Sequence, residues 1–311
     1  MGQRTGFLLV LLTAIISGVS IFANSFAVQG FNPFAFTFLK TAVVAVFLFS
    51  IILLLKDLKA VKALSRKQLG QLAIIGLIGG SIPFLLFFYA LTLTTAINAG
   101  FLHKTLFLWA SLFALFFLKE KLDKKFIFAA LLLLAGNFLL FNISAFGLPE
   151  MLILIATVLW AAENTLSKRV LKDLSGSIVA FGRMFFGSIF ILAFLVFTNQ
   201  ATSTITLSIQ QIQWVLISSA FLLAFVFTFY SGLKHLPVHK ATAVLLLAQP
   251  ITAFLSFAFL GKEILPIQGF GFLLITTGVF LLFGVGFFLN SIKTDRFSTK
   301  TEGLSLAPEQ N

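Results

Sequence analysis

Apolar residues run along this chain in ten long blocks, separated by short polar segments. A helix of about 20 apolar residues crosses the hydrocarbon core of a bilayer. The blocks therefore predict ten membrane-spanning helices, near residues 6–27, 33–55, 69–91, 95–118, 126–143, 149–167, 177–198, 212–233, 240–260 and 266–289.

Composition places the chain among integral membrane proteins. It is 59% hydrophobic and 10% charged, with a mean hydropathy of +1.07. A soluble fold has no single core that hides so much apolar surface, whereas a bilayer solvates it. Cysteine is absent, which excludes disulfides and cysteine-based metal sites. We expect no metal, no cofactor and no catalytic residue.

Charge predicts how the chain sits in the membrane. The formal net charge is +12, and 18 of the 22 Lys and Arg residues fall in segments predicted to lie on the same side of the membrane as the N-terminus. Loops of the other side carry only Lys262. Because cytoplasmic loops are enriched in Lys and Arg, we expect both termini in the cytoplasm and the plasma (inner) membrane as the location. Nucleic acid is not an expected partner, because the basic residues are scattered among short loops.

Two pairs of matched phrases reveal an internal repeat. FALFFLKEKL contains Glu120 and SFAFLGKEIL contains Glu263, 143 residues later. Lys40 and Arg183 have the same spacing, in PFAFTFLKTAVVAVFLF and GSIVAFGRMFFGSIFIL. A shared offset with matching charged residues argues against a chance likeness of apolar segments. Inverted repeats are typical of secondary transporters.

The repeat predicts the domain organisation. Each copy holds five spans, an odd number, so the second copy enters the membrane upside down relative to the first. The predicted fold is an all-α integral membrane protein of ten helices in two inverted five-helix repeats. The first repeat is assigned to residues 1–145, the second to 146–290, and a disordered cytoplasmic tail to 291–311.

This constellation resembles the EamA branch of the drug/metabolite transporter superfamily. The resemblance rests on five-plus-five spans, a Glu-bearing loop after spans four and nine, and a cation early in spans two and seven. It implies ten helices around a central cavity and transport of a small metabolite by alternating access, often export of amino acids or related solutes. The chain departs from the family pattern at three places. Where the family usually has an aromatic-Gly pair, this chain has Ser17-Gly18 and Trp160-Ala161. It has Lys40 in place of the family's Arg, and Lys119 and Lys262 in place of the small residue before each loop Glu. These departures leave the substrate unassigned.

Three basic residues predict a cationic patch within the membrane. A charged side chain at a helix centre costs about 2.5–3.5 kcal/mol, so each one needs a partner, a cavity or a function. Lys40, His103 and Lys104 fall in the outer half of spans two and four. Facing a cavity, they suit a carboxylate or phosphate group of a substrate. Alternatively, Lys40 snorkels outward or binds helix-end carbonyls.

Glu163 is the only carboxylate well inside a span, and Arg183 lies at a similar depth in the next span. The spacing predicts a Glu163–Arg183 salt bridge, either structural or acting as an inner gate. The alternative makes Glu163 a proton-coupling group with a pKa raised by desolvation. A neighbouring Arg183 argues against this, because it favours the charged carboxylate.

Other polar residues carry weaker signals. Gln249, beside the mid-span Pro250, and Trp160 are further candidates for substrate binding, while Trp160 and Tyr89 are equally compatible with packing. Pro83 and Pro250 remove backbone hydrogen bonds and leave carbonyls free.

Two further motifs have structural interpretations. Glu120 and Glu263 are expected to cap the helix that follows each of them rather than to bind substrate. Gly76 and Gly80 form a G-x-x-x-G motif, which is equally suited to packing within the chain and to a homodimer.

A secondary transporter is the function that the sequence favours, exporting a small polar metabolite such as an amino acid or organic acid. An intramembrane enzyme is not expected, because there is no Ser–His–Asp set, paired Asp or H-E-x-x-H motif in the spans. Without a Walker A motif, ATP-driven pumping is not expected either. A non-transporting receptor or scaffold on the same fold is the alternative. The expected partners are the solute and the lipid bilayer.

Overall fold

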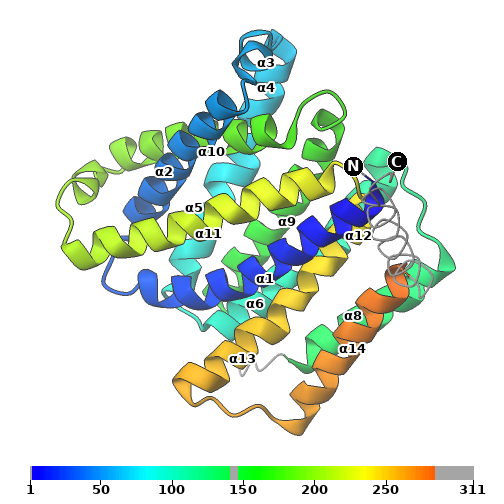
Figure 1. Cartoon of the computed structure of the whole chain (residues 1–311). Helices are drawn as coiled ribbons and strands as arrows, with labels where there is room; N and C mark the ends of the chain where they lie inside the picture. The colour runs from blue at the N-terminus through cyan, green and yellow to red at the C-terminus, as the bar shows by residue number, and fades with distance from the viewer. Residues whose placement is uncertain (1, 141–145, 284–311) are drawn as a thin grey trace, which may run out of the picture.

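The computed structural model describes residues 2–140 and 146–283, which form a helical bundle with no β-strand (Figure 1). The first half contains α1 (Gln3–Ala27), α2 (Pro33–Leu54), α3 (Leu58–Lys62), α4 (Arg66–Ile75), η1 (Gly76–Ser81), α5 (Ile82–Leu91), α6 (Ala96–Lys104), α7 (Leu106–Phe113), η2 (Ala114–Leu118) and α8 (Lys124–Leu139). The second half contains α9 (Leu148–Val170), α10 (Gly176–Phe197), η3 (Ala201–Thr204), α11 (Ile209–Leu233), α12 (Val238–Val244), η4 (Leu245–Leu247), α13 (Ala248–Leu260) and α14 (Pro266–Phe283).

Helical segments are found for all ten predicted spans. Nine of the described segments are long and apolar enough to cross a bilayer. The fifth span, α8, has 16 residues and falls short of that length. The predicted ends of spans five and ten and the predicted tail at 291–311 lie outside the described residues.

The repeat is visible in the helix boundaries. Helices α2 and α10 both have 22 residues, and they begin at Pro33 and Gly176, 143 positions apart. The segments 96–118 and 238–260 likewise have 23 residues each. The two halves therefore carry the same succession of five spans, as the inverted-repeat prediction requires.

Left-handed turn residues repeat with the helices. Lys56 has φ 59° after α2, and Asn199 has φ 56° after α10. Lys119 has φ 56° after η2, and Gly261 has φ 62° after α13. A positive φ is uncommon for residues other than glycine, so its recurrence at spacings of 143 and 142 marks equivalent turns.

The G-x-x-x-G motif packs inside the chain. A Cβ on Gly80 would collide with the backbone oxygen of Arg183, and one on Gly76 would lie 2.9 Å from the backbone nitrogen of Gly187. Both glycines therefore bring η1 into close contact with α10. The motif serves an intramolecular contact, and a homodimer stays a prediction.

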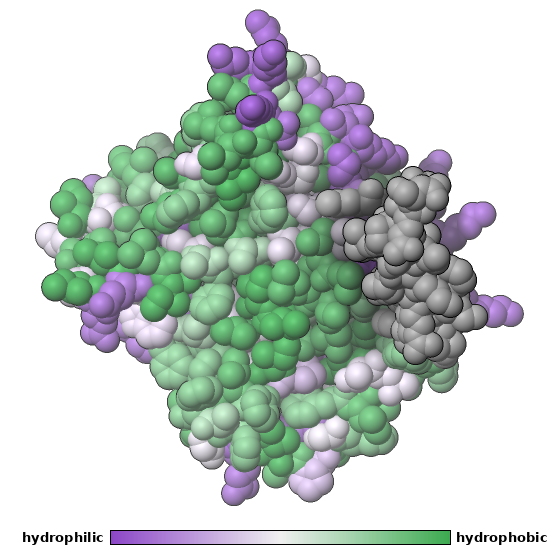
Figure 2. Space-filling model, viewed as in Figure 1, coloured by the Kyte–Doolittle hydropathy of each residue, from purple (hydrophilic) through white to green (hydrophobic). Residues whose placement is uncertain are grey.

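Basic residues gather at one end of the bundle. Figure 2 shows an apolar surface across the middle of the molecule, with hydrophilic residues clustered over α3 and α4 at the top of the view. Helices α2, α9 and α11 and segment η2 finish at this end, and α4, α8, α10 and α12 begin there. We call it the lysine-rich end. The other end is called the opposite end.

Candidate functional site

A central cavity of about 80 Å³ lies between helices of both halves. This volume has room for several water molecules. Three basic side chains line the cavity, namely Lys40, His103 and Arg183. The other polar lining residues are Ser17, Ser20, Asn24 and Asn164, and most of the remaining wall is aromatic or aliphatic.

Lys40 places an unpaired ammonium at this cavity. Its side chain is 2% exposed, and Nζ lies 3.2 Å from the centroid of the Phe88 ring and 4.9 Å from that of Phe84. Such contacts stabilise a cation through the ring quadrupole. Within the part of the chain that the structure describes, Nζ has no carboxylate or hydrogen-bond partner. The ammonium therefore lies among rings at the cavity instead of snorkelling to a helix end.

Lys104 lies behind the cavity wall, which differs from the sequence expectation. It is 1% exposed and donates a hydrogen bond from Nζ to Ser17 Oγ at 2.9 Å. Ser17 and not Lys104 lines the cavity. His103 does line it, and its ring centroid lies 4.9 Å from that of Trp160 in an edge-to-face arrangement. Of the three residues of the predicted patch, Lys40 and His103 therefore line the cavity, whereas Lys104 joins α6 to α1 behind its wall.

Glu163 and Arg183 form the predicted ion pair. Arg183 Nη1 lies 3.8 Å from Glu163 Oε2, with the side chains 4% and 0% exposed. Tyr230 joins them, because its hydroxyl donates to Glu163 Oε1 at 2.6 Å and accepts from Arg183 Nη1 at 3.0 Å. Ser167 Oγ also donates to Glu163 Oε1. This buried network fixes Arg183 at the cavity edge.

Pro83 frees a carbonyl that completes the network. Proline lacks an N–H, so the Gly79 carbonyl, four residues earlier, has no donor at the i + 4 position of an α-helix. It accepts hydrogen bonds from Trp160 Nε1 and Arg183 Nη2, both at 2.9 Å. A Cβ at Gly79 would collide with the side chain of Glu163, which explains the glycine at this position. Trp160 lines the cavity as expected, with its indole held by the freed carbonyl.

Gln249 does not reach the cavity. Its Nε2 donates to the Ile97 carbonyl at 3.1 Å, and the side chain packs against Gly100. It therefore joins α13 to α6 instead of lining the candidate site. Tyr89 is also outside the cavity, 37% exposed and stacked on Phe34 with a centroid distance of 5.7 Å.

Glu120 caps a different helix from the one predicted. It accepts hydrogen bonds from the backbone N–H groups of Val238 and His239, at the start of α12 in the other half of the chain. His239 Nδ1 lies 2.6 Å from Glu120 Oε2. Helix α8, which follows Glu120 in sequence, is capped by Asp123 instead.

These contacts set the protonation of Glu120. Burial raises the pKa of this carboxyl, but the hydrogen bonds from His239 and Val238 lower it more, so the pKa lies below its ordinary value. The carboxylate that holds α12 is therefore the stable form at neutral pH.

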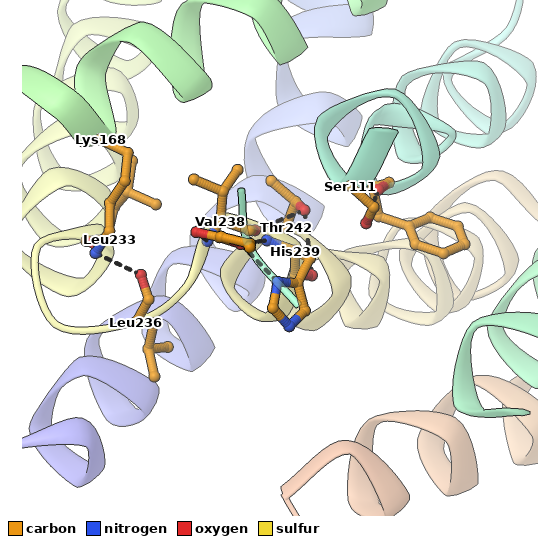
Figure 3. A network of polar contacts seen from close by, with 9 residues as sticks. Ser111, Lys168, Leu233, Leu236, Val238, His239 and Thr242 are labelled. Atoms are coloured by element: carbon orange, nitrogen blue, oxygen red, sulfur yellow. Dashed lines mark hydrogen bonds and ion pairs between the residues drawn. The ribbon is translucent and has the colours of Figure 1, made fainter. Parts of the chain in front are cut away.

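Lys168 ties the same region down. Its ammonium donates to the carbonyls of Leu233 and Leu236 at 2.7 Å each, in the turn that leads into α12 (Figure 3). Figure 3 shows this lysine pointing toward Leu236, in the turn that precedes Val238 and the start of α12. At the lysine-rich end, Glu120 thus joins the two halves of the chain through hydrogen bonds. Lys168 joins α9 to the turn between α11 and α12 within the second half.

Glu263 makes no equivalent contact. It is exposed and has no hydrogen bond or ion pair among the residues that the structure describes. The first turn of α14 is instead closed by Gln268, whose Oε1 accepts from the Leu265 N–H at 3.0 Å. The expected cap by Glu263 is therefore wrong, and the two matched acids occupy different environments.

Charge around the cavity is unbalanced. Lys40, Lys104 and Arg183 are all buried, whereas Glu163 is the one buried carboxylate that contacts any of them in the described residues. Burying a charge without compensation is unfavourable, and among the described residues only this one carboxylate contacts these three basic side chains.

Several of these residues were missing from the sequence-based site. Tyr230 lies near the end of the eighth span, His239 follows that span and Lys168 follows the sixth, all at the side where the charges follow the ordinary positive-inside pattern. The available signal was Tyr230 itself, a polar aromatic residue inside the eighth predicted span and one of only two tyrosines in the chain.

Comparison with known proteins decides the family. The model of the EamA-like transporter family matches residues 4–142 and 147–284. This chain belongs to the EamA-like transporter family. The two matched segments cover both halves, so the family assignment and the two-repeat fold agree.

The relatives of this EamA-family chain are also described as transporters. A protein named "Uncharacterized transporter" from Clostridium kluyveri is 29% identical over 280 residues, covering 84% of this chain and 88% of the relative. Another with the same name, from Archaeoglobus fulgidus, is 26% identical over 274 residues, covering 87% and 83%. A solved crystal structure is similar in fold, with a TM-score of 0.72 at 18% identity, covering 89% of this chain and 96% of the other.

Proposed function

We propose that this membrane transporter is a secondary transporter that exports a small carboxylate-bearing metabolite, such as an amino acid or organic acid, by alternating access. The observation that carries the proposal is the unpaired Lys40 ammonium beside Arg183 at the central cavity. A substrate carboxylate would supply the missing negative charge.

The cavity offers separate places for the parts of such a solute. Lys40 Nζ and Arg183 Cζ lie 4.9 Å and 5.3 Å from the centroid of the same ring, Phe84, so both cations reach one region. In a site of low dielectric, attraction between these cations and a carboxylate is stronger than in water. Aromatic rings such as Phe87 and Trp160 would contact the apolar part of the solute.

Alternating access requires the lysine-rich end to open. The positive-inside rule supports this end as the cytoplasmic one, and export as the direction follows the family resemblance. We propose that the cavity opens there when Glu120 releases the start of α12. By the repeat, Glu263 is the counterpart of Glu120, and the start of α6 is the counterpart of the start of α12. Glu263 would then hold α6 when the opposite end closes.

Glu163 and Arg183 have a proposed part in the same cycle. Arg183 is shared between the cavity and its bonds to Glu163, Tyr230 and Gly79. A bound carboxylate would compete with Glu163 for this guanidinium, and that competition would couple occupancy to the packing of η1 against α9 and α10.

Counterflow in proteoliposomes tests the function. Vesicles loaded with a mixture of amino acids and organic acids are presented with each labelled solute in turn. We expect the wild type to accumulate a carboxylate-bearing solute, and Lys40→Gln to lose that accumulation. Lys262→Gln is the matched control, since it removes an exposed cation distant from the cavity. Absence of counterflow with every solute by folded wild type would favour a receptor or scaffold instead.

A further inference from the structure

An apolar groove of about 630 Å³ lies on the outside of the bundle between α2, α4 and α10. Its wall includes Val46 and Phe49 on α2 and Phe185 on α10, which are 66%, 38% and 41% exposed. Small residues such as Ala45 and Gly182 form part of the wall, which makes room between the larger side chains. In a membrane-spanning bundle, a groove of this kind faces lipid chains.

The groove leads directly into a cluster of positive charge at the lysine-rich end. Val61 and Leu64, in and after α3, line the groove, and they alternate in sequence with cations. We call the basic cluster the five exposed residues Lys56, Lys59, Lys62, Arg66 and Lys67. Figure 2 shows it as the hydrophilic cap over α3 and α4.

The basic cluster has almost no compensating charge. Asp57 is the only acidic residue between positions 56 and 67. Among the described residues, no hydrogen bond or ion pair involves any of the five basic side chains. They are therefore available to an external anion.

The internal repeat shows that the fold of this segment does not need the charges. The counterpart after α10 is TNQATSTITLS, residues 198–208, which contains no charged residue. It nevertheless forms the same kind of turn, with Asn199 in the left-handed conformation that Lys56 adopts. The cluster is thus an addition to a turn that forms without it.

We propose that the groove and the basic cluster together bind one anionic phospholipid. An acyl chain lies in the groove along α2 and α10, and the phosphate headgroup lies at Lys59, Lys62 and Arg66. Basic residues beside a membrane surface attract anionic lipids, while zwitterionic lipids present the same chains with no net charge. The headgroup charge therefore determines which lipid occupies the groove.

Fluorescence quenching by brominated lipids tests this site locally. Phe185→Trp places an indole in the groove, and the signal of the three native Trp residues is subtracted using the wild type. The variant is reconstituted in phosphatidylcholine vesicles that contain a minor fraction of either brominated phosphatidylglycerol or brominated phosphatidylcholine. We expect about fivefold tighter association of the anionic lipid with the groove.

Charge variants decide the outcome. We expect Lys59→Gln/Lys62→Gln/Arg66→Gln to abolish the preference, and the control Lys121→Gln/Lys124→Gln/Lys125→Gln, with as many charges removed at the same end, to retain it. High salt should reduce the preference of the Phe185→Trp variant itself for the anionic lipid. This measurement needs no charge variant, so it still tests the proposal if the triple variant misfolds. Equal quenching by the two lipids, or a preference unaffected by charge removal and salt, would overturn the proposal.

Discussion

At the scale of single residues, Lys40 and Arg183 show how one repeat position acquires two environments. Both lie at the same position early in the second span of their repeat, and both line the central cavity. Arg183 is tied to Glu163 and Tyr230, whereas Lys40 is surrounded by aromatic rings. Arg183 is thus held by polar partners, whereas Lys40, which has only ring contacts in the described residues, is the proposed ligand-binding cation.

Tyr230 gives the first prediction. Tyr230→Phe removes the hydroxyl that links Glu163 to Arg183 and leaves the rest of a fully buried ring in place. Because a buried hydrogen-bonding group then loses its partner, we expect a stability loss of about 1–3 kcal/mol. Thermal unfolding in detergent measures it.

The second tyrosine is the control for this variant. Tyr89 is 37% exposed, and no comparable network surrounds it, so Tyr89→Phe is expected to unfold as the wild type does. Equal melting temperatures for all three proteins would mean that the Glu163–Arg183 pair does not depend on Tyr230.

Sequence identified some of these residues and missed others for one physical reason. The spans are apolar on nearly every face, so the pattern of apolar residues does not say which face turns inward. Lys40 and Lys104 were therefore indistinguishable in sequence, although one lines the cavity and the other bonds Ser17. The Glu163–Arg183 pair was predictable because depth and opposite charge alone determine it.

At the scale of helices, Glu120 holds the start of α12. Glu120→Gln keeps an oxygen acceptor but removes the negative charge. That charge strengthens the hydrogen bonds of Glu120 with two backbone N–H groups and with His239. We expect the lysine-rich end to open more often. Since the chain has no cysteine, Asn164→Cys supplies a single thiol at the cavity. Its reaction with a membrane-impermeant reagent should accelerate several-fold from the lysine-rich side.

The inverted counterpart supplies the comparison for this prediction. Glu263 is exposed in this conformation, so Glu263→Gln should leave the reaction from the lysine-rich side unaccelerated. If the two substitutions had the same effect, Glu120 would have no special part in closing that end.

The pKa of Glu120 sets the pH range of the contact. Because the folded pKa lies below the ordinary value of 4.5, the contact contributes its full stability above that value. The contribution is lost as pH falls through the folded pKa. Because the thiolate is the reacting form, the rate is compared at each pH between the Asn164→Cys protein and the same protein carrying Glu120→Gln. We expect the ratio of the two rates to be constant near neutral pH and to approach one as the pH falls through the folded pKa of Glu120.

At the scale of the whole molecule, the two halves are matched in span order, turn positions and charged residues. The number and order of the spans followed from apolar block length, because bilayer thickness fixes that length. The partners of Glu120 did not follow, because they lie 118 and 119 positions away, in the other half. A carboxylate at the end of a span signals a helix cap without indicating which helix it caps.

Topology is testable with the same cysteine-free chain. Lys121→Cys and Lys262→Cys place thiols in equivalent turns of the two halves, both at exposed positions. In inverted repeats these turns lie on opposite sides of the membrane. We expect an impermeant reagent to label Lys121→Cys only from the cytoplasmic side and Lys262→Cys only from the outside. Labelling of both from one side would rule out the inverted arrangement.

The most direct measurement of the central proposal compares a transported carboxylate with its neutral amide in counterflow, for the wild type and Lys40→Gln. We expect the wild type to favour the carboxylate by about tenfold or more, as a charged hydrogen bond of about 1.5–3 kcal/mol implies. Lys40→Gln should lose most of that preference while remaining folded. A preference of the same size in both proteins would contradict a role for Lys40 in binding the carboxylate.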